Sequence, residues 1–165
     1  MKTLFIGGVK SGKSRLAEAA ILKFSSEIKP IYLATNEVFD AEMQARITVH
    51  QRQRQDFFHT LEEPLKLFEV LQKCQAPVLI ECVTMWLNNA LYHQIPEHKI
   101  LQELEAILNL PNDLFFVHNE VGFGIIPDNA LARQFVDLSG KAAQLMASYC
   151  DVVYFCSAGL ALKMK

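Results

Sequence analysis

Short runs of apolar residues recur along the chain, and each is followed by a stretch in which apolar residues repeat at helical spacing. This alternation is typical of an α/β protein with a mainly parallel sheet. The runs are apolar at successive positions, which predicts strands buried on both faces. We expect five strands, over Thr3 to Ile6, Pro30 to Ala34, Val78 to Ile80, Leu114 to Val117 and Val152 to Cys156.

Helical periodicity fills much of the sequence between these runs. Asp40 is the expected N-cap of one helix, and Pro64 suits the first turn of another. Helices are expected over Lys13 to Phe24, Asp40 to Arg54, Pro64 to Lys73, His98 to Leu108 and Asn129 to Tyr149. The inward face of the first of them comprises Leu16, Ala17, Ala20, Ile21 and Phe24.

The composition is that of a compact globular protein, with 51% apolar and 21% charged residues. The length of 165 residues fits one domain over residues 1–165. A net charge of -2 provides no general positive field for nucleic acid. No apolar run approaches the roughly 18 residues of a membrane span.

The cysteines and the first residues bear on the cellular compartment. Cys74, Cys82, Cys150 and Cys156 include no C-x-x-C pair, so zinc-ribbon and thioredoxin-like spacings are missing. We expect reduced thiols, most of them packed in the interior. The first strand follows Met1–Lys2 directly, which leaves no room for a secretory signal. The expected location is the cytoplasm.

A phosphate-binding motif lies between the first strand and the first helix. The segment matches G-x-x-x-x-G-K-[ST], with the residues Gly7, Gly8, Val9, Lys10, Ser11, Gly12, Lys13 and Ser14. Backbone N–H groups of such a loop point at phosphate oxygens, and the helix N-terminus adds its dipole. Lys13 would contact the outer phosphates and the Ser14 hydroxyl would ligate Mg²⁺. The expected fold is therefore a P-loop NTPase-like three-layer α/β fold with a mainly parallel central sheet.

A P-loop protein usually needs a further carboxylate to hold the metal, directly or through water. Glu81 directly follows a predicted strand, and ligand sites in open α/β sheets lie at the carboxyl ends of strands. Glu81 is thus the expected partner of Ser14 at the metal. Asn119 and Glu120 follow another strand and have the same placement.

The P-loop alone admits kinases, ATPases, regulatory GTPases and nucleotidyltransferases. Asp137 and Gly140 form a D-x-x-G string, but it lies in a helix-like segment rather than after a strand, and no N-K-x-D accompanies it. A GTPase is therefore disfavoured. A small-molecule kinase and a nucleotide-binding switch or assembly protein remain open at this point.

A second candidate for chemistry lies on the helix after Asp40. Arg46, His50 and Arg54 are spaced four apart and share one helix face. His50 is either a solvated surface residue or a nucleophile at a triphosphate, with the arginines neutralising charge. The residue pattern leaves both interpretations open.

Several motifs together resemble one family, the bifunctional adenosylcobinamide kinase / adenosylcobinamide-phosphate guanylyltransferase of cobalamin assembly. The resemblance covers nearly the whole chain. Its motifs are the P-loop, Ala34-Thr35-Asn36, Arg46-Ile47-x-x-His50-x-x-x-Arg54, Glu62-Glu63-Pro64, Glu81-Cys82-Val83-Thr84-Met85-Trp86-Leu87-x-Asn89, Asn119-Glu120-Val121-Gly122-x-Gly124-Ile125-x-Pro127, Leu131-Ala132-Arg133 and Gly140.

The resemblance implies two reactions. The family phosphorylates adenosylcobinamide with a nucleoside triphosphate, ATP or GTP, and then transfers GMP from GTP to the product with release of pyrophosphate. A GMP-histidine adduct falls on His50, with Lys13 as the second catalytic residue. Besides the P-loop, the implied nucleotide contacts are Ala34, Thr35, Asn36, Gln51, Arg52, Gln53, Arg54, Glu62 and Glu81, and a homo-oligomer, a trimer, is implied.

Two departures from the family pattern stand out. Ala143 takes the place of an asparagine that the family often has in its long helix, and the segment between Tyr92 and Leu114 is short. These departures would alter corrinoid binding or subunit packing. The nucleotide-site residues show no such loss.

Overall fold

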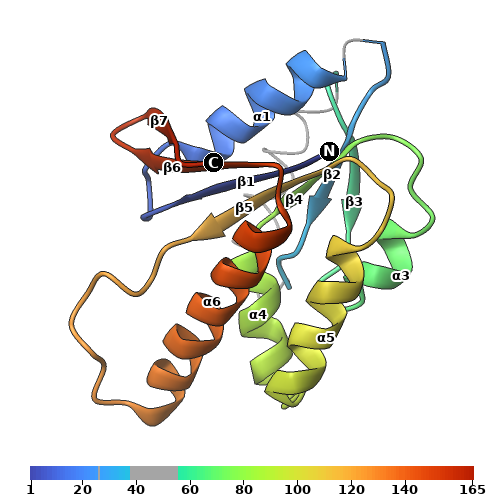
Figure 1. Ribbon diagram of the computed structural model, residues 1–165. Coiled ribbons are helices and arrows are strands. Elements are labelled where there is room, and N and C mark those ends of the chain that lie inside the picture. The colour runs from blue at the N-terminus through green and yellow to red at the C-terminus, as the bar shows by residue number, and fades with distance from the viewer. Residues whose placement is uncertain (26, 38–55) are drawn as a thin grey trace.

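The computed structural model describes residues 1–25, 27–37 and 56–165. These residues form a seven-stranded sheet in the order β3-β2-β4-β5-β1-β6-β7 (Figure 1). The strands are β1 (Lys2–Gly7), β2 (Ile31–Ala34), β3 (His59–Glu62), β4 (Val78–Glu81), β5 (Leu114–Asn119), β6 (Val152–Ser157) and β7 (Leu160–Lys163). The described helices are α1 (Lys13–Phe24), α3 (Leu67–Leu71), α4 (Val83–Tyr92), α5 (Glu97–Leu108) and α6 (Ala130–Tyr149).

Parallel pairing joins every neighbouring pair of strands except the last. β1 lies between β5 and β6, and β7 returns antiparallel to β6 as a hairpin. The prediction of a mainly parallel α/β sheet is confirmed. Because parallel strands end at the same edge, the carboxyl ends of β1 to β6 collect the loops that carry the candidate site.

Helices cover both faces of the sheet, as Figure 1 shows with α1 on one side and α4, α5 and α6 on the other. Adjacent strand residues alternate between the two cores. Leu4, Leu33, Ile80 and Phe116 join one core with α3 to α6, which also contains Trp86. The second core, against α1, comprises Phe5, Ala17, Ile21, Tyr32, Phe58, Leu79, Phe115, Val117 and Cys156. Both faces of β4 and β5 are thus buried, as the continuous apolar runs predicted.

Helix α1 has the predicted bounds, but one residue of its inward face was assigned wrongly. Ala17 and Ile21 are fully buried, and Leu16 and Ala20 pack partly against the same core. Phe24 is 43% exposed at the last turn, where its ring makes a tilted contact with Phe115. The helix ends there and the chain turns away, so little remains to cover Phe24.

Three elements were missed by the sequence pattern, for different reasons. β3 and β7 are short edge strands with mostly exposed side chains, so they lack the apolar run of a central strand. α4 begins one residue after β4 ends, and its apolar positions continue those of the strand without a turn signal. The helix predicted over Pro64 to Lys73 is shorter, because Pro64 and Leu65 form a loop before Leu67–Leu71. The helix predicted over Asp40 to Arg54 lies outside the described residues.

The cysteine prediction is confirmed. All four cysteines are free, and Cys82, Cys150 and Cys156 are buried while Cys74 is partly covered. Among the described residues, no helix has the length and apolar character required to cross a bilayer.

Candidate nucleotide-binding site

The predicted site residues meet at the carboxyl edge of the sheet. Ala34 at the end of β2 is in register with Glu62 of β3 on one side and Glu81 of β4 on the other. On the other side of β4, Gly7 at the end of β1 is in register with Asn119 at the end of β5. The topology therefore brings together residues that are more than a hundred positions apart in the sequence.

The loop from Gly7 to Ser14 has the backbone of an anion cradle. Lys10 and Gly12 have φ angles of 57° and 91°, so the chain curls tightly before α1 begins at Lys13. The Ser11 N–H donates to the Gly8 carbonyl at 3.2 Å, and Lys13 Nζ donates to the same oxygen at 3.0 Å. The loop is thereby closed around the N-terminal end of a twelve-residue helix.

Two polar groups in this loop are withdrawn from water. Lys13 is only 6% exposed and Ser11 8% exposed, and the Ser11 hydroxyl has no hydrogen-bond partner among the described residues. Burying an ammonium or a hydroxyl without a full set of partners is costly. An anion with several acceptor oxygens offsets that cost, so the loop matches the chemistry of a phosphate chain.

Ser14 and Glu81 lie together, as predicted. Ser14 Oγ donates to Glu81 Oε1 at 2.8 Å, although 67 residues separate the two in the sequence. Two neighbouring ligands of an octahedral Mg²⁺ with bonds of 2.0–2.1 Å lie about 3 Å apart. The observed separation and the hard oxygen donors fit that ion. Within the described part of the chain there is no cluster of three or more histidine, cysteine or acidic residues that would form an all-protein metal cage.

The remaining predicted contacts differ in accessibility. Ala34 is half-buried, whereas Asn36 and Glu62 are exposed at the same edge of the sheet. Thr35 is fully buried, and its hydroxyl both donates to the Cys82 carbonyl at 2.7 Å and accepts from the Cys82 N–H at 2.9 Å. Thr35 therefore ties β2 to the junction of β4 and α4. His50 and the predicted contacts Gln51, Arg52, Gln53 and Arg54 lie outside the described residues.

A buried asparagine supports the same junction from α4. Asn89 Nδ2 donates to the carbonyls of Thr35 at 2.7 Å and Pro64 at 3.1 Å. Trp86 Nε1 donates to the Leu65 carbonyl at 2.8 Å. The family-like stretch from Glu81 to Asn89 thus anchors the backbone beside the site, a role that its residue types alone did not indicate.

The segment that follows β5 lies beside the start of the P-loop. The Glu120 N–H donates to the Gly7 carbonyl at 3.0 Å, and the Asn119 N–H donates to Thr84 Oγ1 at 2.7 Å. A small cavity lies beyond, beside Arg133, lined also by Val121, Gly122, Gly124, Ile125, Ile126, Pro127, Val136 and Asp137. Asn119 and Glu120 therefore lie beside the P-loop, and their contact with the nucleotide stays a prediction.

His118 is a site-proximal residue that sequence reasoning missed. It is 1% exposed, with Nδ1 3.1 Å from Thr84 Oγ1 and Nε2 3.0 Å from Ser139 Oγ. Burial lowers its pKa to about 4, helped by the positive charge of Lys13 and opposed by the hydrogen bond with Ser139. The sequence offered one signal for this buried residue, a histidine directly after the apolar run that ends at Val117. His118 is therefore a neutral link between α4, β5 and α6.

Two thiols near the P-loop are not activated nucleophiles. Burial raises the pKa of Cys82, and the neighbouring charge of Glu81 raises it further. Burial also raises the pKa of Cys156, with Lys13 opposing the shift. A thiol that stays protonated is a weak nucleophile.

The sheet order and the loop after β1 define a P-loop α/β nucleotide-binding fold. One solved structure, described as an ATPase domain, matches over 93% of this chain and 68% of its own length, with a TM-score of 0.50 and 12% identity. At that identity the likeness shows the fold alone.

Sequence comparison is more specific. Residues 3–164 match the profile of the family described as cobinamide kinase / cobinamide phosphate guanyltransferase. The chain is 38% identical to the bifunctional adenosylcobalamin biosynthesis protein CobP of Pseudomonas aeruginosa, over 100% of this chain and 98% of that protein. It is 34% and 33% identical to the CobU proteins of Escherichia coli and Salmonella typhimurium, which bear the same description, over 100% of each sequence. The chain belongs to the cobinamide kinase / cobinamide phosphate guanyltransferase family, as its motifs indicated.

The first two glycines of the P-loop have different surroundings, which predicts different costs of substitution. A Cβ atom on Gly7 would collide with the backbone carbonyl of Cys156, whereas one on Gly8 meets nothing within 4 Å. Gly7→Ala is expected to destabilise the fold by about 1–3 kcal/mol or more. Gly8→Ala is expected to change stability by about 0.5 kcal/mol or less. Urea unfolding of both variants measures this, and equal stabilities would contradict the packing argument.

His118 also predicts a pH dependence of stability. Its folded pKa of about 4 lies below the unfolded value of about 6.5, so the unfolded state binds an extra proton between these values. The resulting contribution is fully present above pH 6.5 and is lost at about 1.4 kcal/mol per pH unit as the pH falls toward 4. Urea unfolding between pH 7.5 and 5 should therefore show a steeper loss in the wild type than in His118→Gln. Parallel pH profiles for the two proteins would contradict the assignment.

Proposed function

We propose that this protein carries out both reactions of its family. It phosphorylates the hydroxyl of adenosylcobinamide with a nucleoside triphosphate, GTP or ATP, and then transfers GMP from GTP to adenosylcobinamide phosphate. The observation that carries the proposal is the contact of Ser14 with Glu81 beside the P-loop, in a chain whose full length aligns with the bifunctional relatives. Both reactions require a site for a triphosphate and its metal ion.

The P-loop would hold the triphosphate in each reaction. Its backbone N–H groups and Lys13 would bind the outer phosphates, and Ser14 and Glu81 would hold Mg²⁺. Mg²⁺ would supply positive charge for the leaving group in either reaction. Ala34, Asn36 and Glu62 are proposed to face the nucleotide at the same edge of the sheet, and the fully buried Thr35 would support the backbone beneath them.

The guanylyl transfer needs a nucleophile, and His50 takes this role by family resemblance. A nitrogen of neutral His50 attacks the α-phosphorus of GTP, the bond to the β-phosphate oxygen breaks, and pyrophosphate leaves. A phosphate oxygen of the acceptor then attacks the same phosphorus, and the phosphorus–nitrogen bond breaks to free His50. Arg46 and the segment from Gln51 to Arg54 are proposed to neutralise charge and contact GTP.

The wider setting follows from the same proposal. Both substrates are cytoplasmic metabolites in this scheme, which agrees with four free cysteines. We propose that residues 1–165 act as one nucleotide-binding domain within a homo-oligomer, a trimer by family resemblance. Neither nucleic acid nor membrane enters the scheme.

The nucleophile assignment predicts a covalent adduct. Incubation with Mg²⁺ and α-labelled GTP should label the protein through an acid-labile, base-stable bond, as expected of a phosphoramidate. His50→Ala should abolish the label, while His98→Ala, which removes an exposed histidine on α5, should retain it. Label that persists in His50→Ala refutes the role of His50. If the wild type takes up no label yet phosphorylates adenosylcobinamide, the protein is a simple small-molecule kinase, and if neither occurs, a nucleotide-binding switch.

The metal assignment gives a second prediction. Glu81→Gln keeps an oxygen that accepts from Ser14 but removes the negative charge, so the loop should stay folded while Mg²⁺ binds less tightly. We expect the Mg²⁺ concentration for half-maximal kinase activity to rise about 10- to 100-fold. Glu69→Gln, an exposed change on α3, is the matched control. An unchanged Mg²⁺ dependence in Glu81→Gln would remove Glu81 from the metal site.

A further inference from the structure

The C-terminal hairpin contacts the P-loop through its turn. β6 and β7 are joined by Ala158 and Gly159, with φ angles of 53° and 78°, and Ser157 is paired with Leu160 across them. Two successive positive φ angles are the geometry of a type I′ turn. The Gly159 N–H donates to the carbonyl of Ser11 at 2.9 Å, so the tip of the hairpin is bonded to the middle of the phosphate loop.

The contact is a backbone-to-backbone approach that leaves no space for side chains. A Cβ atom on Gly12 would lie 2.9 Å from the Cα atom of Gly159. Contacts under 3.0 Å are not tolerated by backbone atoms without movement. The glycine of the G-K-[ST] string is thus required for the approach of the hairpin as well as for its own positive φ.

The direction of this hydrogen bond determines where the next amide points. In a planar trans peptide the C=O and the N–H point in opposite directions. Since the Ser11 carbonyl is bonded to the hairpin, the Gly12 N–H of the same peptide unit is turned away from the hairpin. In a phosphate-binding loop the backbone N–H groups point into the loop, toward the anion.

We propose that Gly159 is a positioning residue for phosphate binding. Its N–H holds the Ser11–Gly12 peptide plane so that the Gly12 N–H is aimed at the triphosphate. The inference rests on the proposed function for the identity of the ligand, and it adds a residue from the C-terminal hairpin that the P-loop motif does not contain.

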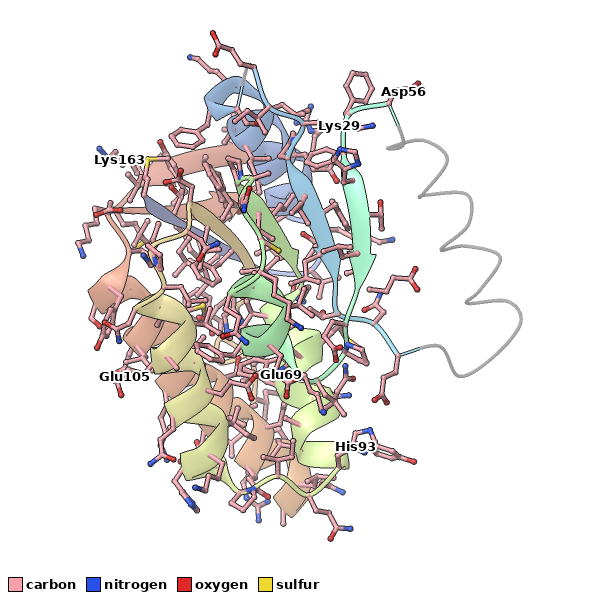
Figure 2. The ribbon with its side chains drawn as sticks, turned by 90° about the vertical axis from the view of Figure 1, so that its right-hand side faces the viewer. Lys29, Asp56, Glu69, His93, Glu105 and Lys163 are labelled. Atoms are coloured by element: carbon pink, nitrogen blue, oxygen red, sulfur yellow. The ribbon has the colours of Figure 1, made fainter. Side chains whose placement is uncertain are left out.

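Within the described sheet, β7 pairs with β6 and with no other strand. β7 is the outer strand of the sheet, with Leu160 74% and Leu162 68% exposed. Figure 2 shows Lys163 of β7 on the opposite side of the molecule from Asp56, which precedes the other edge strand, β3. The turn contact with Ser11 is therefore a link between an exposed edge strand and the phosphate loop.

The test removes one N–H without changing any side chain. Cys156 allows ligation of a fragment of residues 1–155 to a synthetic peptide of residues 156–165, giving the full chain. In one product glycolic acid replaces Gly159, so that an ester oxygen stands where the N–H was. In the matched control the hydroxy-acid analogue of methionine replaces Met164, whose N–H donates to the Val153 carbonyl at 2.8 Å inside the hairpin.

The readout is the affinity for Mg·GTP and for tripolyphosphate, compared with the all-amide ligated chain. The Gly159 ester should bind both ligands about tenfold more weakly, because the Gly12 N–H would lose its charge-assisted hydrogen bond to the phosphate. The Met164 ester should bind like the all-amide chain. Thermal unfolding without ligand shows that each product is folded. Equal affinities for the two esters, with both folded, would overturn the proposal and leave the proposed function intact.

A second pair of variants covers the case in which the ligated chain does not refold. Gly159→Ala strains the turn at φ 78° and should weaken tripolyphosphate binding, whereas Ala158→Gly relieves a positive φ and should leave it unchanged. Unchanged binding in a folded Gly159→Ala variant would contradict the inference. If the wild type binds neither Mg·GTP nor tripolyphosphate, both the inference and the proposed function fail.

Discussion

Close packing of backbone around the loop after β1 is the constraint on which the rest of this structure depends. The loop is enclosed by the residue after β5, through the Glu120 N–H on the Gly7 carbonyl, and by the C-terminal hairpin, through the Gly159 N–H on the Ser11 carbonyl. Side chains are excluded from these contacts, so the path of the loop is set by hydrogen bonds and by glycine. The direction of each N–H in such a loop can be set without bulky side chains. Because the peptide unit is planar, a hydrogen bond that fixes its C=O also fixes its N–H.

A second layer of polar contacts holds the strand ends in register around the loop. Thr35 bridges β2 to the junction of β4 and α4. The side chain of Asn89, on α4, donates to the carbonyls of Thr35 and Pro64. His118 joins Thr84 to Ser139 in the same way between α4 and α6. All of these contacts except the one with Pro64 are buried, where hydrogen bonds are least exposed to competition from water. Glu81, one of the proposed metal ligands, thus lies beside a junction that these bonds tie to the neighbouring strand and helix.

The sequence predicted the parts of this arrangement that local patterning encodes. The five central strands, the bounds of α1 and the meeting of Ser14 with Glu81 followed from apolar runs, a motif and the rule that sites lie at strand ends. α4 was missed because its apolar positions run on from β4, and the edge strands because exposed strands carry no apolar run. The roles of His118 and Gly159 depend on contacts with Ser139 and Ser11, far away in the sequence. No local pattern encodes such pairings. The prediction on His50 stays a prediction.

The buried hydroxyl of Ser11 and the buried ammonium of Lys13 have a consequence for the life of the protein in the cell. Groups that are desolvated for the sake of an anion lower the stability of the protein on its own. A ligand that binds only the folded chain offsets this through mass action, by about 2.7 kcal/mol at a concentration 100 times its dissociation constant. Abundance would then follow the supply of triphosphate, since proteolysis removes chains in proportion to the unfolded fraction. If the loop binds a triphosphate as proposed, Ser11 and Lys13 would thereby make nucleotide a determinant of how long the protein persists.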